Sequence, residues 1–125
     1  MPELSIPSAI LSMYGESAQL IHNRLTPPKE GERSNEGILS DILRKMFAVV
    51  DSIVNDEQYS YCDEIKELSE YLTRIALSLP DFKKIESTDI VTEMKNWVQK
   101  NVHSENKECE GMLLSFRSML GELLP

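Results

Sequence analysis

The residues that could carry out chemistry are few in this 125-residue chain, and they stand far apart. The only two histidines, His22 and His103, have no cysteine, histidine or carboxylate at a helical offset that suits a metal site. With two histidines and many serines, no pairing of a nucleophile with a base stands out. The five glycines are isolated, so there is no phosphate-binding loop. We therefore expect no enzyme activity, no metal and no cofactor.

The two cysteines, Cys62 and Cys109, are 47 positions apart, and neither belongs to a CxxC motif. We expect both to be reduced thiols in the core, as is usual in an intracellular protein. The N-terminus lacks the basic-then-apolar order of a signal peptide, and no apolar run reaches the roughly 20 residues of a membrane span. These features predict an intracellular protein without a membrane segment.

The formal net charge is −8, and the acidic residues are concentrated in one stretch. Residues 51–70 contain seven acidic side chains and a single cation, Lys66, which gives a local charge of −6. Such a surface repels phosphate backbones, so we expect no direct contact with nucleic acid. It is either a solvated helix face or a docking surface for a basic partner, and Tyr59 and Tyr61 beside it either pack or take part in recognition.

Five stretches have apolar residues at the spacing of a helix, and none alternates like a strand. The first begins at Ser5-Ile6-Pro7 and is followed by a proline-containing linker, residues 26–35. The second is the most apolar, and Asn35 is placed to cap it. We expect an all-α, compact bundle of four to five helices, with residues 1–34 as an N-terminal helix and linker and residues 35–125 as the bundle domain.

The later helices are delimited by capping and breaking residues. Ser60 to Asp63 has the spacing of a capping box that opens the third helix, and Pro80 prevents that helix from continuing. A short helical turn is expected at residues 81–86, after which Ser87 or Thr88 caps the fourth helix. The last helix is expected to start at Ser104 and Glu105. Trp97, the only tryptophan, lies on the apolar face of the fourth helix, so we expect it in the core.

The residues from Tyr71 onward also follow the pattern of a known family. That pattern is a helix ending in Leu-Pro, a short helical turn, a threonine-led helix, a loop and a last helix with an aromatic residue. The matching residues are Tyr71, Leu72, Leu79, Pro80, Phe82, Ile85, Thr88, Ile90, Met94, Trp97, Cys109, Leu113, Phe116, Met119 and Leu120. In these positions the chain resembles the N-terminal domain of transcription elongation factor TFIIS, with its relatives in Elongin A and a Mediator subunit, and the integrase-binding domain of lens epithelium-derived growth factor.

The resemblance implies a nuclear module that binds short disordered peptide motifs of transcription and chromatin proteins through two interhelical loops. Val54 and Asn55 match the first loop, and Val102 with the adjacent His103 matches the second. Lys100 stands where the family has an aromatic residue, and this departure puts the peptide preference in doubt. The acidic surface also differs from the basic surfaces of some relatives and disfavours acidic motifs.

Two other kinds of protein fit the same sequence. The chain could be a structural or adaptor subunit, in a homo- or hetero-oligomer, whose second or N-terminal helix packs on a partner chain. It could also be a small viral or bacterial helical effector. In each case the expected partner is a protein or a peptide.

Overall fold

The computed structural model describes residues 5–79, 88–101 and 108–124. Within these ranges there are five α-helices and no strand, which confirms the prediction of an all-α compact bundle. The helices are α1 (Ile6–Leu25), α2 (Asn35–Asn55), α3 (Cys62–Leu77), α4 (Thr88–Asn101) and α5 (Cys109–Leu123), and a 3-10 turn, η1 (Tyr59–Tyr61), precedes α3. The expected turn at residues 81–86 and its proline, Pro80, lie outside the described residues.

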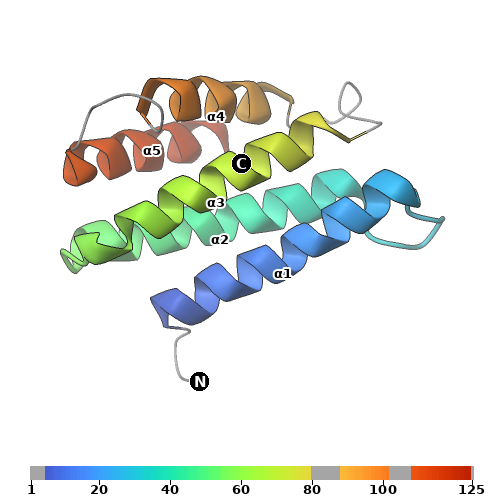
Figure 1. Ribbon diagram of the computed structural model, residues 1–125, viewed down its shortest axis with the longest axis horizontal. Helices are drawn as coiled ribbons and strands as arrows, with labels where there is room; N and C mark the ends of the chain where they lie inside the picture. Colours follow the sequence, from blue (N-terminus) through green and yellow to red (C-terminus); the bar gives the residue numbers. More distant parts are fainter. Residues whose placement is uncertain (1–4, 80–87, 102–107, 125) are drawn as a thin grey trace.

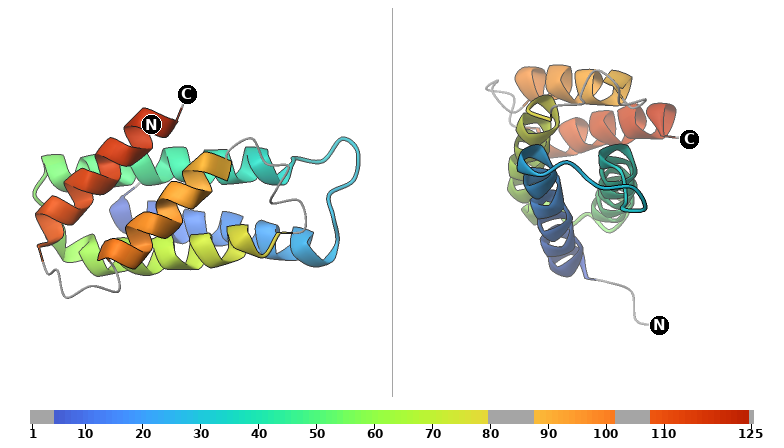
Figure 2. Two further views of the ribbon diagram at one scale, coloured as in Figure 1. Left: turned by 90° about the horizontal axis from the view of Figure 1, so that it is seen from above. Right: turned by 90° about the vertical axis from the view of Figure 1, so that its right-hand side faces the viewer.

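The helices form two groups, a three-helix unit (α1, α2 and α3) and an α4–α5 pair that covers one side of it (Figure 1). In the three-helix unit, successive helices run antiparallel and α1 packs on both of the others. The pair crosses above this unit at an angle, with α4 on α3 and α5 on α2 (Figure 2). The helix starts of α3 and α5 therefore meet at the same end of the bundle.

Serine side chains cap the first two helices. Ser5 accepts a hydrogen bond from the Ser8 N–H at the start of α1, and Pro7 occupies the first turn as predicted. At α2 the cap is Ser34, whose hydroxyl accepts from the Gly37 N–H at 3.1 Å. The prediction that Asn35 is the cap is wrong by one residue. Asn35 is the first helical residue, and its side chain is buried against α1.

The boundaries of α3 and α5 also differ from those expected. No capping box forms at Ser60 and Asp63, because the chain enters α3 through η1 and the N-cap position is occupied by Tyr61, whose side chain makes no capping hydrogen bond. The helix ends at Leu77, two residues before Leu79, since the residue that precedes a proline avoids the helical conformation. α5 begins at Cys109, after the expected start at Ser104 and Glu105, two residues that lie outside the described part of the chain.

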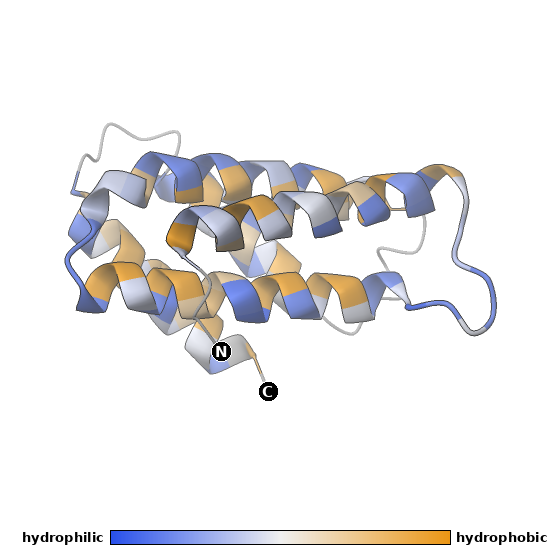
Figure 3. Ribbon diagram, turned by 90° about the horizontal axis from the view of Figure 1, so that it is seen from below, coloured by the Kyte–Doolittle hydropathy of each residue, from blue (hydrophilic) through white to orange (hydrophobic). Residues whose placement is uncertain are grey.

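One hydrophobic core connects all five helices. The colours along the helices in Figure 3 alternate between apolar and hydrophilic residues, as amphipathic helices require, whereas the loop between α1 and α2 is hydrophilic. Met13 and Leu20 of α1 are fully buried in the same cluster as α2 and α3, so the N-terminal helix packs on the bundle. A division of the chain at residue 34 stays a prediction. Trp97 lies in the core, as expected, with 5% of its surface exposed.

Candidate partner-binding site

The predicted binding residues of the first loop lie at the C-terminal end of α2. Asn55 is exposed, and its amide Nδ2 donates to Asp51 Oδ2 at 3.3 Å, one helical turn earlier. Val54 is half-buried and packs against the core. A partner could therefore reach the Asn55 side chain directly, whereas Val54 presents only part of its surface.

The predicted residues of the second loop are only partly described. Lys100 is exposed in the last turn of α4 and lines a cavity of about 210 Å³ between α4 and α5. Val102 and His103 lie outside the described residues. The C-terminal ends of α2 and α4 are nevertheless at the same end of the bundle (Figure 1), so Asn55 and Lys100 belong to the same end of the molecule.

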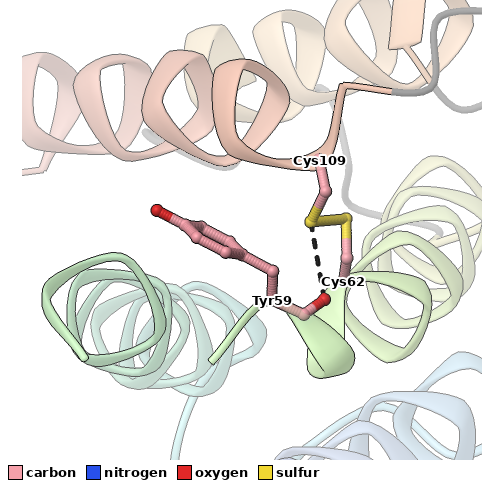
Figure 4. Close-up of a disulfide and its surroundings, with 3 residues drawn as sticks. All are labelled: Tyr59, Cys62 and Cys109. Atoms are coloured by element: carbon pink, nitrogen blue, oxygen red, sulfur yellow. Dashed lines mark hydrogen bonds between the residues drawn. A yellow bond between two sulfur atoms is a disulfide. The ribbon is translucent and has the colours of Figure 1, made fainter. Parts of the chain in front are cut away.

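A disulfide between Cys62 and Cys109 holds this end together (Figure 4). The expectation of two reduced core thiols is wrong, because the fold brings the starts of α3 and α5 side by side. The Cα atoms of the two cysteines are 6.0 Å apart, within the range that a disulfide spans. The bridge ties the α2–α3 connection to α5. No local pattern in the sequence indicates this pairing, which depends on the packing of distant helices.

The carbonyl oxygen of Tyr59 lies next to the bridge, 3.6 Å from Cys109 Sγ. A sulfur in a disulfide carries no proton, so this approach is a hydrogen bond only when Cys109 is a thiol. The Tyr59 ring is half-buried and packs against the core. Burial raises the pKa of the Tyr59 phenol, and the Glu110 carboxylate, which accepts a hydrogen bond from it, raises it further.

The surface around the disulfide is strongly acidic. Six exposed carboxylates come from the α2–α3 connection and from the helix starts that the disulfide joins: Asp56, Glu57, Asp63, Glu64, Glu108 and Glu110. Arg117 of α5 is engaged by Asp51 of α2 at 3.0 Å. The field at this end is therefore negative and favours cationic partners over anionic ones.

The structure also contains a groove that sequence reasoning did not anticipate. It lies between the first half of α1 and the second half of α2, has a volume of about 360 Å³ and is lined mainly by apolar side chains such as Ile6, Ala9 and Val49. At one end Lys45 forms an ion pair with Glu16 and donates to Ser12. The periodicity of each helix showed its apolar face but could not show where two faces fail to close on each other.

Two kinds of feature are absent from the described ranges. Among these residues, no group of three or more histidine, cysteine or carboxylate side chains is arranged to hold a metal ion. None of the helices built from them combines the length and the apolar character needed to cross a bilayer.

Comparisons of the chain with protein-family models, with curated proteins and with solved structures find no match. The arrangement described above is therefore the basis for any assignment of function.

Proposed function

We propose that the chain is a non-catalytic interaction module that binds short disordered peptide motifs, as the resemblance to the TFIIS N-terminal domain implies. The proposal places the peptide at the end of the bundle where Asn55 and Lys100 lie, and it keeps Val54, Val102 and His103 as predicted contacts. The observation that carries it is the joining of two chain segments at this end by the Cys62–Cys109 bridge. A bridged, rigid end can present residues from separate connections as one surface, which lowers the entropic cost of binding a flexible peptide.

The charge of this end favours a basic motif. Six exposed carboxylates surround the disulfide, and like-charge contact with an acidic peptide would oppose binding. We therefore expect a peptide with lysine or arginine residues flanking an apolar anchor. Transcription and chromatin proteins, which the resemblance suggests as partners, would have to supply such a segment.

A nuclear location is part of this proposal, and the disulfide provides a check on it. Disulfides persist in oxidising compartments, whereas nuclear and cytosolic proteins are normally kept reduced. If the protein acts in the nucleus, its cysteines should be thiols there, and the reduced protein should still bind the peptide, more weakly than the bridged form because its site is less rigid. Alkylation of free thiols during cell lysis, followed by mass spectrometry of Cys62 and Cys109, distinguishes the two states.

The test is a peptide-display selection with the purified full chain, followed by affinity measurements on the selected peptides. Asn55→Lys introduces a cation into the proposed site and should weaken binding of a basic peptide by about tenfold or more. Thr92→Lys is the matched control, because it makes the same charge change on an exposed position near the other end of α4. Equal affinities for both variants and the parent, with unchanged circular dichroism, would exclude this end as the site.

A second function, that of a subunit packing on another chain, is favoured by the outer face of α1. Leu11 and Leu25 are the most exposed large apolar residues among those described, with 73% and 77% of their surfaces accessible. Gly15, Ala18 and His22 lie between them at steps of three and four residues, so all five share one exposed helical face. Light scattering after size-exclusion chromatography tests this function. A stable dimer that Leu11→Glu dissociates would favour it, and a monomer would favour the peptide-binding module.

A further inference from the structure

The linker between α1 and α2 begins with the only place in the sequence where a hydroxyl side chain directly precedes a proline. Thr26 is followed by Pro27, and Lys29 stands three positions after Thr26. The other prolines follow methionine, isoleucine, leucine or another proline. The order of a hydroxyl residue, a proline, any residue and a cation is the one that proline-directed protein kinases of the cyclin-dependent type phosphorylate.

Two positions of this order have a physical reason. A kinase cleft that leaves the backbone nitrogen after the acceptor residue without a hydrogen-bond partner accepts proline, which has no N–H, and disfavours other residues. A cation at the third position after the acceptor can pair with an anionic group of the kinase. In this sequence, Thr26 is the only hydroxyl residue that meets both requirements.

The structure presents this segment to solvent. Thr26 is exposed and is the C-cap of α1, with the extended backbone (φ −131°, ψ 95°) that is usual before a proline. Residues 27–29 lie outside the helices, and Pro27 and Lys29 are exposed. The loop that they begin projects beyond the end of the bundle (Figure 2). A kinase that binds its substrate in an extended form can therefore reach the segment without displacing a core residue.

The residues before Thr26 also permit access. Arg24 and Leu25 end α1 and are exposed, so they can unwind at little cost, as helix ends commonly fray. The next residue inward, Asn23, is buried and donates to Asn35 Oδ1 at 2.8 Å. This contact holds the rest of α1 in place, so the segment available to a kinase is residues 24–29.

We propose that Thr26 is a phosphorylation site for a proline-directed kinase that recognises Pro27 and Lys29. In the reaction, Thr26 Oγ1 forms a bond to the γ-phosphorus of ATP, and the bond from that phosphorus to the oxygen bridging the β- and γ-phosphates breaks. ADP leaves, and the hydroxyl proton passes to the catalytic base of the kinase. The presence of such a kinase in the same compartment rests on the nuclear location in the proposed function.

The phosphate changes the charge at the C-terminal end of α1. It carries about −1.5 to −2 charges at pH 7. Negative charge is unfavourable at this end of a helix, where the last carbonyl groups already carry partial negative charge. The Thr26 N–H donates to the His22 carbonyl at 2.9 Å and closes the last turn. We expect phosphorylation to weaken this turn and to place a charge next to Leu25, where it opposes the packing of another chain on the outer face of α1.

The test incubates the purified full chain with ATP and an active cyclin-dependent kinase, and fragmentation mass spectrometry locates the phosphate. We expect one phosphate on Thr26. Thr26→Ala should abolish the incorporation, whereas Thr92→Ala is the matched control and should preserve it, because Thr92 is exposed and is not followed by a proline. No incorporation into the parent, or incorporation that persists in Thr26→Ala, would overturn the assignment.

Two further variants test what the kinase recognises. Pro27→Ala and Lys29→Ala should each lower kcat/KM for phosphorylation by about tenfold or more. Both residues are exposed outside the helices, so the circular dichroism should not change. Lys95→Ala is the control for Lys29, since it removes an exposed cation from α4. An undiminished kcat/KM in both linker variants would show that the order of residues is not recognised and would also overturn the assignment.

Hydrogen exchange measures the effect of the phosphate on α1. In the phosphorylated chain, the amides of residues 22–26 should exchange several-fold faster, while those in the middle of α1 stay protected. Unchanged exchange would contradict the expected weakening of the last turn.

The outcomes separate this inference from the proposed function. If the purified kinase modifies Thr26 but no peptide is selected by display, the phosphorylation site stands and the proposed function is wrong. If selected peptides bind but Thr26 takes up no phosphate, the module stands and the phosphorylation site is wrong.

Discussion

The three-helix unit and the α4–α5 pair are held together in different ways. In the three-helix unit, aliphatic side chains are buried along the whole length of α2 and α3, and serine side chains cap α1 and α2. The α4–α5 pair has shorter helices, of 14 and 15 residues, and α5 has no side-chain cap. The pair shares the hydrophobic core, and among the described residues three further contacts join it internally or to the rest: the stack of Trp97 on Phe116, the Cys62–Cys109 bridge and the Arg117–Asp51 ion pair.

This difference indicates that the α4–α5 pair, although it shares the hydrophobic core, depends more than the three-helix unit on a few specific contacts. Isolated short helices are marginal in water, so α4 and α5 depend on tertiary contacts for their stability. Loss of one of these contacts should therefore destabilise α4 and α5 before it affects α1, α2 and α3. Local opening of this kind is measurable by hydrogen exchange, which reports the free energy of opening for each segment.

The largest effect is expected from Trp97→Ala. Truncation of a buried tryptophan costs about 3–5 kcal/mol, a large part of the roughly 5–15 kcal/mol that stabilises a domain of this size. Phe116 would also lose its stacking partner. We expect the variant to be largely unfolded at about 37 °C and to show no cooperative thermal transition there, because a loss of this size removes most of the free energy of unfolding. Trp97→Phe is the control that keeps an aromatic ring. A melting temperature within a few degrees of the parent would show that the pair does not depend on this residue.

Reduction of the Cys62–Cys109 disulfide should have the next largest effect. The bridge closes a loop over a sequence separation of 47 residues, and removal of such a cross-link typically costs about 2–4 kcal/mol. Urea unfolding with and without a phosphine reductant measures the loss. Hydrogen exchange should accelerate in α5 and at the start of α3, while the middle of α2 stays protected. Equal acceleration of hydrogen exchange in all five helices would contradict the idea that the α4–α5 pair opens separately from the three-helix unit.

The double variant Cys62→Ser/Cys109→Ser is the control for this experiment. It should match the reduced parent, and the reductant should have no further effect on it. A reductant effect on the double variant would show that the measured change does not arise from the disulfide.

The contrast between the two groups of helices also shows how far the sequence could be interpreted. The apolar periodicity of each helix is a local property, so the helical class, the burial of Trp97 and the packing of a wide apolar α2 could be predicted. The prediction of the α2 cap was wrong by one residue because serine and asparagine are both good N-cap residues. Only the hydrogen bond of Asn35 to Asn23 of α1 distinguishes Asn35 from Ser34, which caps the helix.

The features of the candidate site were harder to predict, since they depend on helices far apart in the sequence. Cys62 and Cys109 carry no local sign of their pairing, which requires α3 and α5 to start side by side. The hollow beside Trp97 likewise results from the way in which α4 and α5 fail to close on each other. Asn55 and Lys100 came from the family resemblance, and their role in binding stays a prediction.

A smaller effect is expected from Asn23→Ala in the three-helix unit. Asn23 is buried, and its Nδ2 donates to Asn35 Oδ1 at 2.8 Å, which joins the end of α1 to the start of α2. Its removal leaves a buried acceptor with one donor fewer and should cost about 1–3 kcal/mol in unfolding free energy. Arg24→Ala is the control, because Arg24 is the neighbouring residue in the last turn of α1 and its side chain is exposed. Equal stability of both variants would show that the buried amide pair contributes nothing specific.

The smallest effects concern two tyrosines, Tyr14 on α1 within the three-helix unit and Tyr59 in η1, close to the bridge that joins α5. Burial raises the pKa of Tyr14 above the ordinary 10.0, and Glu67 of α3 raises it further. The pKa of Tyr59, at the junction with α5, is raised by burial and by Glu110. A raised folded-state pKa means that the stability from the neutral phenols is complete below pH 10.0 and is lost as the pH rises through the folded-state values.

Alkaline titration followed by tyrosinate absorbance tests this difference between the regions. Tyr14→Phe and Tyr59→Phe should each remove absorbance from the part of the curve above the ordinary pKa of 10.0. Reduction of the disulfide should lower the pKa of Tyr59, because loosening of α5 withdraws Glu110 and admits water, while the pKa of Tyr14 should stay raised because α1 and α3 remain packed. If reduction lowers the pKa of both tyrosines equally, the two regions unfold together and the disulfide stabilises the whole bundle as a single cooperative unit.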